Sequence, residues 1–551
     1  MQHPTDFRGV FRDDDDARAV YAEAAGIARA LPLAVAVPVD ADDVAALARW
    51  ASATGTPLVP RGSGSSMAGG AVGDGVIVDL SRLDVIGEVD VERRRVRVGP
   101  GALHARVDAA ARRHRLRFPP DPSSGKFCTI GGMASTNAAG AHTMRYGATR
   151  EWVVALDCVF ADGARVELRR GEPSPAAGVA PALDRFAADV RSDLLAHELA
   201  SPSVHAGVRK ESSGYGLAAY ARTGDLVDLV VGSEGTLAIV VGAELALAPT
   251  PGATSSVLAS FASLEEAVAA AAAARAADAS ACELLDRTFL ELVASSVAKG
   301  HEISSPEVPA GSEAVLLAEV EGQTLDDAVA QASALGEIFR RGGATRVTLA
   351  LDDVQEPALW ELRHAASPVL ARLDPSLKSM QFVEDGAVPA ERLPDYVRGV
   401  REALARRGLR GVIFGHAGDG HVHVNPLVDV TRDGWRDDVR RLLDDVVSLT
   451  ARLGGTLAGE HGDGRLRAPL LERVWPAATR ALFARVKAAF DPDGVLNPGV
   501  IVPLAGQRAV GDVKYDPELP PLPDPARRVL RRVEGERAYA QFRLAMLDEQ
   551  L

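Results

Sequence analysis

The sequence predicts an α+β protein with two or three domains, and three observations support this fold class. The chain has 551 residues, which is too many for one hydrophobic core, because domains usually contain about 100 to 250 residues. Between residues 31 and 250, short Val-rich strands alternate with Ala-rich helices and glycine turns. Near Pro249 the composition changes, and a second series of strands and helices begins. We therefore expect a first domain in residues 1–250, with its core in residues 24–250, and a second domain from residue 251.

The first domain begins with an acidic run at residues 13–16, which we expect to be solvated. Residues 17–31 (ARAVYAEAAGIARAL) are rich in Ala and predict a helix. Residues 96–114 (VRVGPGALHARVDAAARRH) predict a strand followed by a helix.

The second domain contains two successive strand–helix–strand units. The expected elements are strand 255–261, helix 263–277, strand 279–286, strand 314–322, helix 325–341 and strand 345–352. Two such units predict a split βαβ, or ferredoxin-like, arrangement, in which helices cover one face of an antiparallel sheet. A domain of this kind can close as a cap over a cleft, and clefts between domains are favoured ligand sites.

The composition excludes several classes of protein. A formal net charge of −14 argues against a nucleic-acid-binding protein, which usually has a basic face. The three cysteines, Cys128, Cys158 and Cys282, form no CxxC pair, so neither a disulfide framework nor an iron–sulfur cluster is expected. The sequence has no signal-peptide pattern, and its apolar runs are far shorter than the roughly 20 residues of a membrane span. We therefore expect a cytoplasmic protein with no transmembrane segment, for which any membrane contact is peripheral.

The stretch from Pro57 to Gly75 (PLVPRGSGSSMAGGAVGDG) is rich in glycine and serine. Small residues let the main chain approach a ligand closely, and successive N–H groups can then surround an anion. Arg61 adds a positive charge. The spacing fits neither the GxxxxGK[ST] phosphate loop nor the GxGxxG dinucleotide motif, so a diphosphate-binding loop and a surface turn both remain open.

A second candidate site is expected in RGVIFGHAGDGHVHVNPLVD (410–429), where two strand-like arms flank a turn. Strand alternation places His421, His423 and Asn425 on one face of the second arm, and His416 ends the first arm.

The segment AGEHGDGR adds Glu460 and His461 in a glycine-rich turn, where their side chains can reach a cleft. Two histidines and one glutamate with open positions are typical of a divalent-metal site, most often zinc, with manganese or iron as alternatives. An ordinary polar hairpin is the other interpretation.

Three glycine-rich segments, 57–75, 118–147 and 229–240, resemble in this order the flavin domain of the vanillyl-alcohol oxidase and p-cresol methylhydroxylase superfamily. The resemblance implies a two-part FAD-binding domain in which Pro60 contacts the cofactor. The other implied FAD contacts are Arg61, Gly62, Ser63, Gly64, Ser65 and Ser66 at the pyrophosphate, Pro122, Gly131, Gly132, Ser135 and Asn137 along the flavin, and Gly235 and Ile239 near the adenine half. Covalent attachment in this superfamily often uses a His or Cys in the first loop. This loop has neither, so we expect non-covalent FAD.

FGHAGDGHVHVN and GEHGDGR resemble the C-terminal domain of FAD-linked D-2-hydroxyacid dehydrogenases, which include D-lactate dehydrogenases, the glycolate oxidase flavin subunit and D-2-hydroxyglutarate dehydrogenases. The resemblance implies His416, His423 and Glu460 as metal ligands, Asn425 as a substrate contact, His461 as the catalytic residue, and Arg363, Ser367 and Lys378 as carboxylate-binding residues. At position 367 the related enzymes have Thr.

The segment FDPDGVLNPG (490–499) resembles the point where the family returns to its flavin domain, with Asn497 near the flavin. We therefore expect a cap domain with the metal site in residues 251–481, a return to the flavin domain in 482–505, and a C-terminal tail in 506–551.

The resemblance implies oxidation of a D-2-hydroxy acid to the 2-oxo acid. The metal would lower the pKa of the substrate hydroxyl, His461 would accept its proton, and hydride would pass from C2 to flavin N5. Arg363 can hold the carboxylate by two hydrogen bonds. Lys378 suits a second carboxylate, which favours D-2-hydroxyglutarate over D-lactate.

The sequence leaves the identity of the electron acceptor open. The motifs look most like long family members that continue into an iron–sulfur module, but the tail of this chain has no cysteine. A separate iron–sulfur subunit, an electron-transfer flavoprotein or a quinone could therefore accept electrons, and a homodimer is compatible with the sequence.

Three alternatives to this function also remain. An oxidase that uses oxygen on glycolate or another 2-hydroxy acid would release hydrogen peroxide. A flavin subunit active only in a complex would not reduce an artificial dye alone. A metal-dependent hydrolase would not be yellow.

Overall fold

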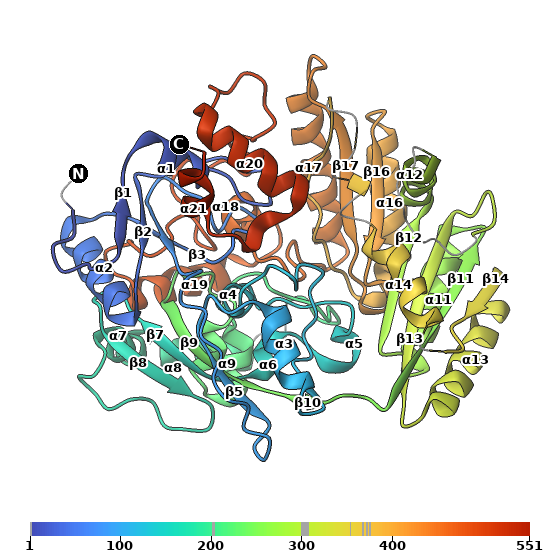
Figure 1. The fold of residues 1–551 in the computed structure, drawn as a ribbon, viewed down its shortest axis with the longest axis horizontal. Coiled ribbons are helices and arrows are strands. Elements are labelled where there is room, and N and C mark those ends of the chain that lie inside the picture. Colours follow the sequence, from blue (N-terminus) through green and yellow to red (C-terminus); the bar gives the residue numbers. More distant parts are fainter. Residues whose placement is uncertain are drawn as a thin grey trace.

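The computed structural model describes residues 3–200, 204–298, 308–352, 354–365, 369–370, 373 and 376–550. The first domain and the cap lie side by side, and the C-terminal tail lies against the first domain (Figure 1). The expected α+β class is confirmed, because both regions combine sheets with helices.

Two four-stranded sheets form the centre of the first domain. One contains β1 (Val10–Arg12), β2 (Ala34–Val37), β4 (Val76–Asp79) and β3 (Leu58–Arg61) in this order, and β1 is its antiparallel edge. The other is antiparallel, in the order β5 (Arg95–Val98), β9 (Ile239–Ala246), β7 (Val153–Val159) and β8 (Arg165–Arg169). Apolar residues of α2 (Ala41–Thr54) share one buried cluster with strands of both sheets, so this helix packs against both sheets.

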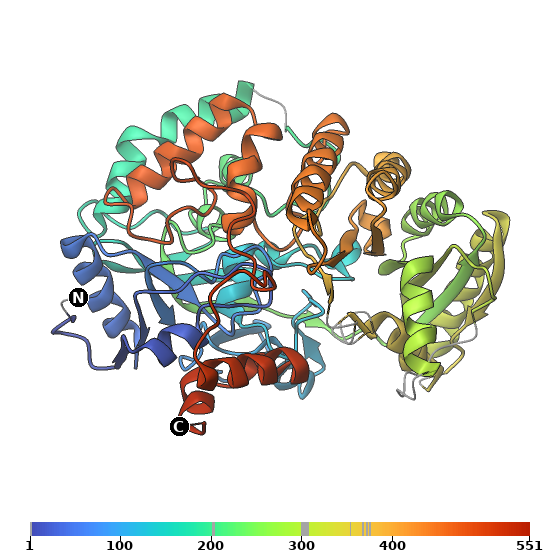
Figure 2. The same cartoon turned by 90° about the horizontal axis from the view of Figure 1, so that it is seen from above.

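The other helices of this domain cover the sheets. They are α3 (His104–Arg112), α4 (Ile130–Thr136), α5 (Thr143–Tyr146), α6 (Thr149–Trp152), α7 (Pro181–Asp189), α8 (Arg191–Ala200), α9 (Leu217–Thr223) and α10 (Val227–Val230). A much later helix, α19 (Ala477–Phe490), packs against α7 (Figure 2). After α19, the main-chain N–H of Leu58 in β3 donates to the carbonyl of Val495 (2.7 Å), so the chain returns to the first domain.

The helix expected in residues 17–31 is much shorter in the structure. It is α1 (Asp15–Val20), which Asp14 caps by accepting from the N–H of Ala17. Beyond it, the N–H of Gly26 donates to the carbonyl of Ser66 (3.1 Å). A Cβ on Gly26 would meet the carbonyl oxygen of Met67 at 2.0 Å, so the chain lies directly against the first glycine-rich loop. This tertiary contact overrides the local helix propensity.

The cap contains a seven-stranded antiparallel sheet. Its order is β14 (Ala344–Leu349), β11 (Ala253–Phe261), β13 (Ala314–Gly322), β12 (Ala281–Asp286), β16 (Arg410–Gly415), β17 (His423–Asp429) and β15 (Leu377–Ser379). The first four strands have the ferredoxin-like order, which confirms the predicted split βαβ arrangement.

Helices lie on both faces of this sheet, not on one face as expected. One buried cluster joins the sheet to α11 (Leu264–Ala276), α13 (Leu325–Arg341), α16 (Leu393–Ala405) and α17 (Trp435–Arg452). A second cluster joins its other face to α12 (Arg287–Ala298) and α14 (Gln355–His364). The reason is that every residue of β12 is buried, so both faces of this strand need a cover.

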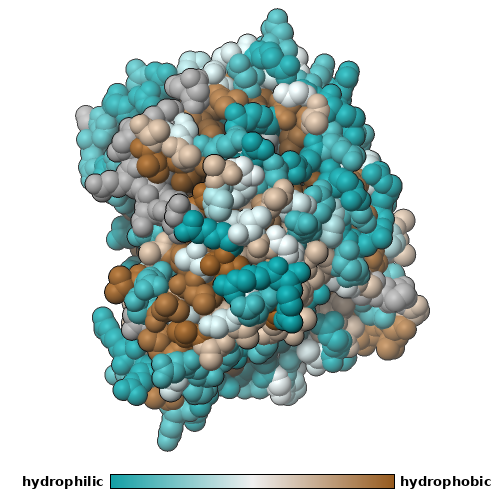
Figure 3. All heavy atoms as spheres, turned by 90° about the vertical axis from the view of Figure 1, so that its right-hand side faces the viewer, coloured by the Kyte–Doolittle hydropathy of each residue, from teal (hydrophilic) through white to brown (hydrophobic). Residues whose placement is uncertain are grey.

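The C-terminal tail connects the two domains. Its helices α20 (Asp524–Glu536) and α21 (Arg543–Asp548) pack against α1 and share a buried apolar cluster with β2 and β3. On the cap side, Nε of Arg436 in α17 donates to Asp516 of the tail (2.8 Å). Within the described ranges, none of the helices combines the length and hydrophobicity needed to cross a bilayer. On the end of the molecule formed by the cap, the hydrophobic residues lie in separate patches among hydrophilic ones (Figure 3).

Candidate active site

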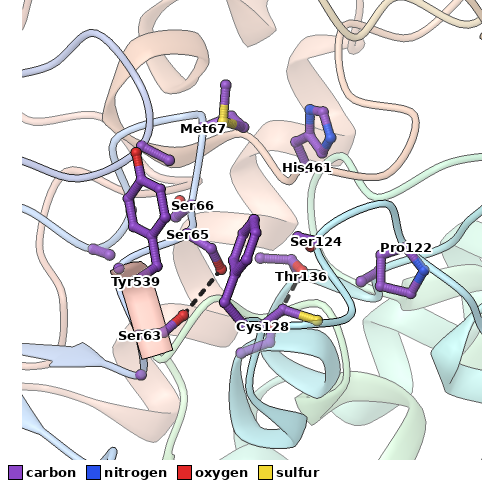
Figure 4. Close-up of a pocket in the computed structure, with 18 of the residues that line it drawn as sticks. Ser63, Ser65, Ser66, Met67, Pro122, Ser124, Cys128, Thr136, His461 and Tyr539 are labelled. Atoms are coloured by element: carbon purple, nitrogen blue, oxygen red, sulfur yellow. Dashed lines mark hydrogen bonds between the residues drawn. The ribbon is translucent and has the colours of Figure 1, made fainter. Parts of the chain in front are cut away.

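A cavity of about 640 Å³ is lined by both domains and by the tail. We call the wall formed by residues 60–71, 122–139 and 234–240 the loop half, and the wall formed by Arg363, Lys378, His423, Asn425, Glu460 and His461 the cap half. Ser63, Ser65 and Ser66 of the first loop, Cys128 and Thr136 of the second segment, and His461 of the cap surround this cavity (Figure 4).

In the loop half, main-chain segments pack closely against neighbouring segments. The first loop follows β3, and Gly64 has a φ of 75°, in the left-handed region that favours glycine. A Cβ at Gly62 would meet Oγ1 of Thr129 at 2.2 Å, so the first loop lies directly against the start of α4. Thr129 caps α4 by accepting from the N–H of Gly132 (3.3 Å).

Most of the expected FAD contacts line the cavity. They are Pro60, Arg61, Gly62, Ser63, Gly64, Ser65, Ser66, Pro122, Gly131, Gly132, Ser135, Gly235 and Ile239. The two expected asparagines do not line it. Oδ1 of Asn137 accepts from the N–H of Arg150 (2.9 Å), and Nδ2 of Asn497 donates to the carbonyl of Glu234 (2.7 Å). Both amides therefore hold neighbouring segments in place from behind the cavity wall.

Arg61 supports the first loop through its own backbone contacts. The residue is 2% exposed, and its guanidinium donates to the carbonyls of Tyr21 (3.1 Å), Ala71 (3.2 Å) and Glu23 (2.9 Å). Oγ of Ser66 is buried and has no hydrogen-bond partner among the described residues. A buried hydroxyl without a partner, in a loop of this composition, fits a bound polar ligand such as a diphosphate.

The tail forms a third wall that the sequence did not predict. Tyr515, Arg531, Glu534, Gly535, Arg537 and Tyr539 line the cavity. The ring of Tyr539 lies 5.2 Å from that of Phe127 and faces the serines of the first loop (Figure 4). Arg543 is 3% exposed, and its Nε and Nη1 have no partner within the described part of the chain. Burial and the charge of Arg61 lower the pKa of Arg543 to about 10, so a nearby anion would stabilise its charged form.

Three side chains of the cap converge on one point. Nε2 of His416 and Nε2 of His423 lie 3.2 Å and 3.3 Å from Oε1 of Glu460. Two ligands at 2.0–2.1 Å from a tetrahedral metal are about 3.4 Å apart, so these distances suit a metal ion. Nδ1 of His416 donates to Oε1 of Glu283 (2.6 Å), and Nδ1 of His423 donates to the carbonyl of Glu384 (3.1 Å). In the neutral form of each ring, Nε2 therefore carries the lone pair that can bind a metal.

His421 does not share a strand face with His423 and Asn425, because β17 begins only at His423. Nε2 of His421 donates to Asp385 (3.0 Å), and its Nδ1 has no partner among the described residues. Its ligand atoms nevertheless lie within the 4.8 Å group formed with His416, His423 and Glu460. Burial lowers its pKa to about 3, so His421 is neutral.

His461 stacks on His423, with ring centroids 5.2 Å apart. Its Nδ1 donates to Oε1 of Glu384 (3.1 Å), and its main-chain N–H donates to Asp385 (2.9 Å). Burial alone would lower the pKa of His461, but the carboxylates of Asp385 and Glu384 raise it to about 9. The buried Arg467 in turn donates to Glu384 (2.5 Å) and Asp385 (3.2 Å). Nε2 of His461 remains available to exchange a proton with a ligand.

A lysine of the first domain reaches Glu460. Nζ of Lys210, whose side chain is fully buried, donates to Oε2 of Glu460 (3.1 Å) and to the carbonyl of Gly140 (2.6 Å). Lys210 and His416 keep the pKa of Glu460 well below its usual value despite burial, so Glu460 is ionised. Glu460 is therefore available as an anionic ligand.

The expected carboxylate-binding residues are partly brought together. Arg363 of α14 is buried and lines the cavity, and its Nε donates to Oε2 of Glu283 (2.6 Å). Lys378 of β15 lines the cavity with its Nζ 5.2 Å from the ring of Tyr515. Oδ1 of Asn425 is buried without a partner among the described residues, so it can accept from a ligand. Ser367 lies outside the described residues.

Comparison with known proteins identifies both domains. Residues 32–169 match the family described as "FAD binding domain", and residues 250–501 match "FAD linked oxidases, C-terminal domain". The chain is 30% identical to the glycolate oxidase subunit GlcD of Bacillus subtilis, over 89% of this chain and 93% of that protein. It is 32% identical to the D-2-hydroxyglutarate dehydrogenase of Pseudomonas putida, over 90% of this chain and 50% of that protein. It is 29% identical to the D-lactate dehydrogenase of Archaeoglobus fulgidus, over 85% of this chain and 91% of that protein.

Solved structures share the fold at low sequence identity. One is p-cresol methylhydroxylase, with a TM-score of 0.64, 14% identity, and coverage of 90% of this chain and 94% of that chain. Another is alkyldihydroxyacetonephosphate synthase, with a TM-score of 0.59, 16% identity, and coverage of 89% and 82%. The expected flavoprotein fold is thereby confirmed. The chain belongs to the family of FAD-linked oxidoreductases acting on 2-hydroxy acids that includes glycolate oxidase subunit GlcD, D-2-hydroxyglutarate dehydrogenase and D-lactate dehydrogenase.

Proposed function

We propose that the protein is a metal-assisted FAD-dependent dehydrogenase that oxidises a D-2-hydroxy acid to the 2-oxo acid. The observation that carries this proposal is the continuity of the cavity. The same space is lined by the glycine and serine loops, which suit FAD, and by His423, Glu460 and His461, which suit a hydroxy acid. A substrate held in the cap half would therefore lie next to a flavin held in the loop half.

The loop half would hold the diphosphate and the flavin of FAD without a covalent bond. The main chain at Gly62 and Gly64 can approach closely, and Oγ of Ser66 is available to the ligand. Tyr539 and Arg537 of the tail would close this half from the side. Burial raises the pKa of the Cys128 thiol to about 12, so this cavity-lining cysteine is protonated and a weak nucleophile near neutral pH. When bound, FAD would supply the hydride acceptor.

His416, His423 and Glu460 would hold a divalent cation, with zinc as the first candidate and manganese or iron as alternatives. When bound, this cation would lower the pKa of a substrate hydroxyl, and its charge beside Glu460 would also lower the pKa of His461. His461 would accept the hydroxyl proton at Nε2, because its Nδ1–H is held by Glu384. Asn425 would accept a hydrogen bond from the substrate, and Arg363 would bind its carboxylate.

Lys378 favours a substrate with a second carboxylate, such as D-2-hydroxyglutarate, over D-lactate. Its charge lies in the cavity beside Tyr515, where it can neutralise an anion. The GlcD relatives are named as subunits of glycolate oxidase. We therefore propose that electrons leave the flavin to a separate acceptor, such as an iron–sulfur subunit, an electron-transfer flavoprotein or a quinone.

Anaerobic visible spectra of the purified protein, supplied with FAD and zinc, test the proposal. Addition of D-2-hydroxyglutarate is expected to bleach the flavin band, D-lactate to bleach it more slowly, and L-enantiomers not at all. Removal of the metal with a chelator should slow bleaching, and restored zinc should reverse that effect. A flavin spectrum that no D-2-hydroxy acid bleaches would contradict the proposed substrate class.

A further inference from the structure

Glu283 contacts two residues of the proposed site, His416 and Arg363, and local sequence does not reveal either contact. It is the third residue of β12, and its side chain is completely buried. Its Oε1 accepts from Nδ1 of His416, and its Oε2 accepts from Nε of Arg363, both at 2.6 Å. One carboxylate thus contacts two side chains that belong to different parts of the proposed site.

The sheet register explains this position. Leu284 of β12 pairs with Gly415 of β16, so Glu283 lies directly across from His416. Alternation along β12 places Glu283 on the same face as Leu285, and Leu285 shares a buried cluster with Leu362 of α14. The next residue of that helix is Arg363. The fold therefore directs β12, the end of β16 and α14 to one point.

We propose that Glu283 is a positioning residue that couples the metal site to the carboxylate-binding arginine. Acceptance from Nδ1 fixes the tautomer of His416 in which Nε2 carries the lone pair for the cation. Acceptance from Nε fixes the guanidinium of Arg363 and leaves its terminal nitrogens for a substrate carboxylate. Because the two oxygens belong to one rigid group, the cation and the carboxylate are held in a fixed relation. This inference rests on the proposed function, since it assigns a purpose to the site described there.

The role requires two acceptor oxygens on one side chain. Both oxygens of Glu283 accept a hydrogen bond, one from His416 and one from Arg363. A glutamine has only one acceptor oxygen, because its other group is an NH₂ donor. In Glu283→Gln, either Arg363 loses its acceptor or His416 is forced into the tautomer with hydrogen on Nε2, which cannot bind a metal.

The test compares wild type, Glu283→Gln and the control Asp286→Asn, each loaded with FAD. Asp286 lies in the same strand and is also buried, but Oδ1 accepts from the N–H of Phe289 (3.0 Å), away from the site. Burial raises its pKa to about 7, so loss of its charge costs little. Zn²⁺ affinity is measured by competition with a chromophoric chelator, and kcat and KM are measured with D-2-hydroxyglutarate at saturating Zn²⁺.

We expect Glu283→Gln to weaken Zn²⁺ binding about 10- to 100-fold and to raise KM, whereas Asp286→Asn keeps both values. At saturating Zn²⁺ and saturating D-2-hydroxyglutarate, kcat should recover to within a few-fold of wild type, because Glu283 does not touch the reacting groups. General structural damage would lower kcat as well. Unchanged Zn²⁺ affinity or unchanged KM in Glu283→Gln would overturn the inference.

A second variant covers the case in which Glu283→Gln does not fold. Glu283→Asp keeps the charge but shortens the side chain by one methylene, so it cannot reach both partners at once. It is expected to show the same two losses, and wild-type values for both would overturn the coupling. Failure of the wild type itself to bind Zn²⁺ would instead bring down the proposed metal site. That result is separate from an effect limited to position 283.

Discussion

The two halves of the cavity use different physical means to prepare for a ligand. The loop half consists mainly of glycine, serine and other small residues, and its guanidinium at Arg61 donates to main-chain carbonyls. The cap half is supported by buried ion pairs, which join Glu460 to Lys210 of the first domain and Glu384 to Arg467. The first half depends on close approach of the backbone, and the second depends on the mutual orientation of charges. Under the proposed function, the residues that hold the cofactor and the residues that transfer the proton are therefore separate sets.

The largest effect on stability is expected from replacing Arg467, the buried cation that pairs with two carboxylates behind the cap half. Arg467→Met removes the partner of two buried carboxylates, Glu384 and Asp385. We expect a loss of about 3 to 5 kcal/mol in the free energy of unfolding, measured by urea denaturation followed by circular dichroism. Arg473→Met is the control, because Arg473 pairs with the exposed Asp444, and its loss should cost about 0 to 1 kcal/mol. Equal, small losses in both variants would mean that the ionic network does not stabilise the cap half.

A smaller effect is expected from backbone strain in the loop half. Gly64 and Gly224 both have a φ of 75°, but only Gly64 lies in the cavity wall. A left-handed alanine costs roughly 1 to 2 kcal/mol, and a Cβ at Gly64 would also meet Nη2 of Arg61 at 2.4 Å, so Gly64→Ala should weaken FAD binding by at least about 5- to 30-fold. Gly224→Ala carries the same strain at the end of α9, with nothing within 4 Å of its Cβ, and should keep wild-type FAD affinity. Flavin fluorescence during titration of the apoprotein measures both values, and equal affinities would contradict the role of the first loop.

Two tyrosines of the tail lie at different halves of the cavity. Tyr539 lies beside the loop half, and Tyr515 lies beside Lys378 in the cap half. Tyr539→Leu removes an aromatic contact worth about 0.5 to 1.5 kcal/mol, so FAD affinity should fall about 2- to 10-fold with KM unchanged. Tyr515→Leu should change KM and keep FAD affinity. The opposite pattern would show that the halves are not assigned as described.

The smallest expected effect is on the pH dependence of stability, and it comes from a contact between the two domains outside the cavity. His142 donates to Asp121 of the first domain (2.5 Å) and Glu319 of the cap (2.8 Å). Burial would lower its pKa, but these carboxylates raise it well above its usual value. Its contribution to stability is therefore complete below about pH 6.5 and is lost as the pH rises through the raised pKa. Thermal unfolding from pH 6 to 9 should show a steeper fall for wild type than for His142→Gln, and parallel curves would contradict this account.

The loop half could be predicted from sequence because its signal is local. The high density of glycine and serine in residues 57–75 indicates a backbone that can approach a ligand closely. The strands and helices of the cap were also predictable, since alternation and Ala-rich runs are local patterns.

The network of the cap half could not be predicted in the same way. Lys210, Glu283 and Arg467 come from three distant segments, and each is a single charged residue that local sequence cannot distinguish from a solvated one. Only the sheet register and the contact between domains bring them together. The contribution of the tail was missed for the same reason, because Tyr539 meets Phe127 only in the folded chain.

The most direct test of the account is anaerobic flavin reduction in His461→Ala, measured by stopped-flow absorbance with D-2-hydroxyglutarate. His461 belongs to the cap half, so the variant should bind FAD within about twofold of wild type, while reduction should be about 10²- to 10⁴-fold slower. Wild-type reduction by His461→Ala would contradict the assignment of proton transfer to this residue. A folded variant that no longer binds FAD would contradict the separation of the two halves.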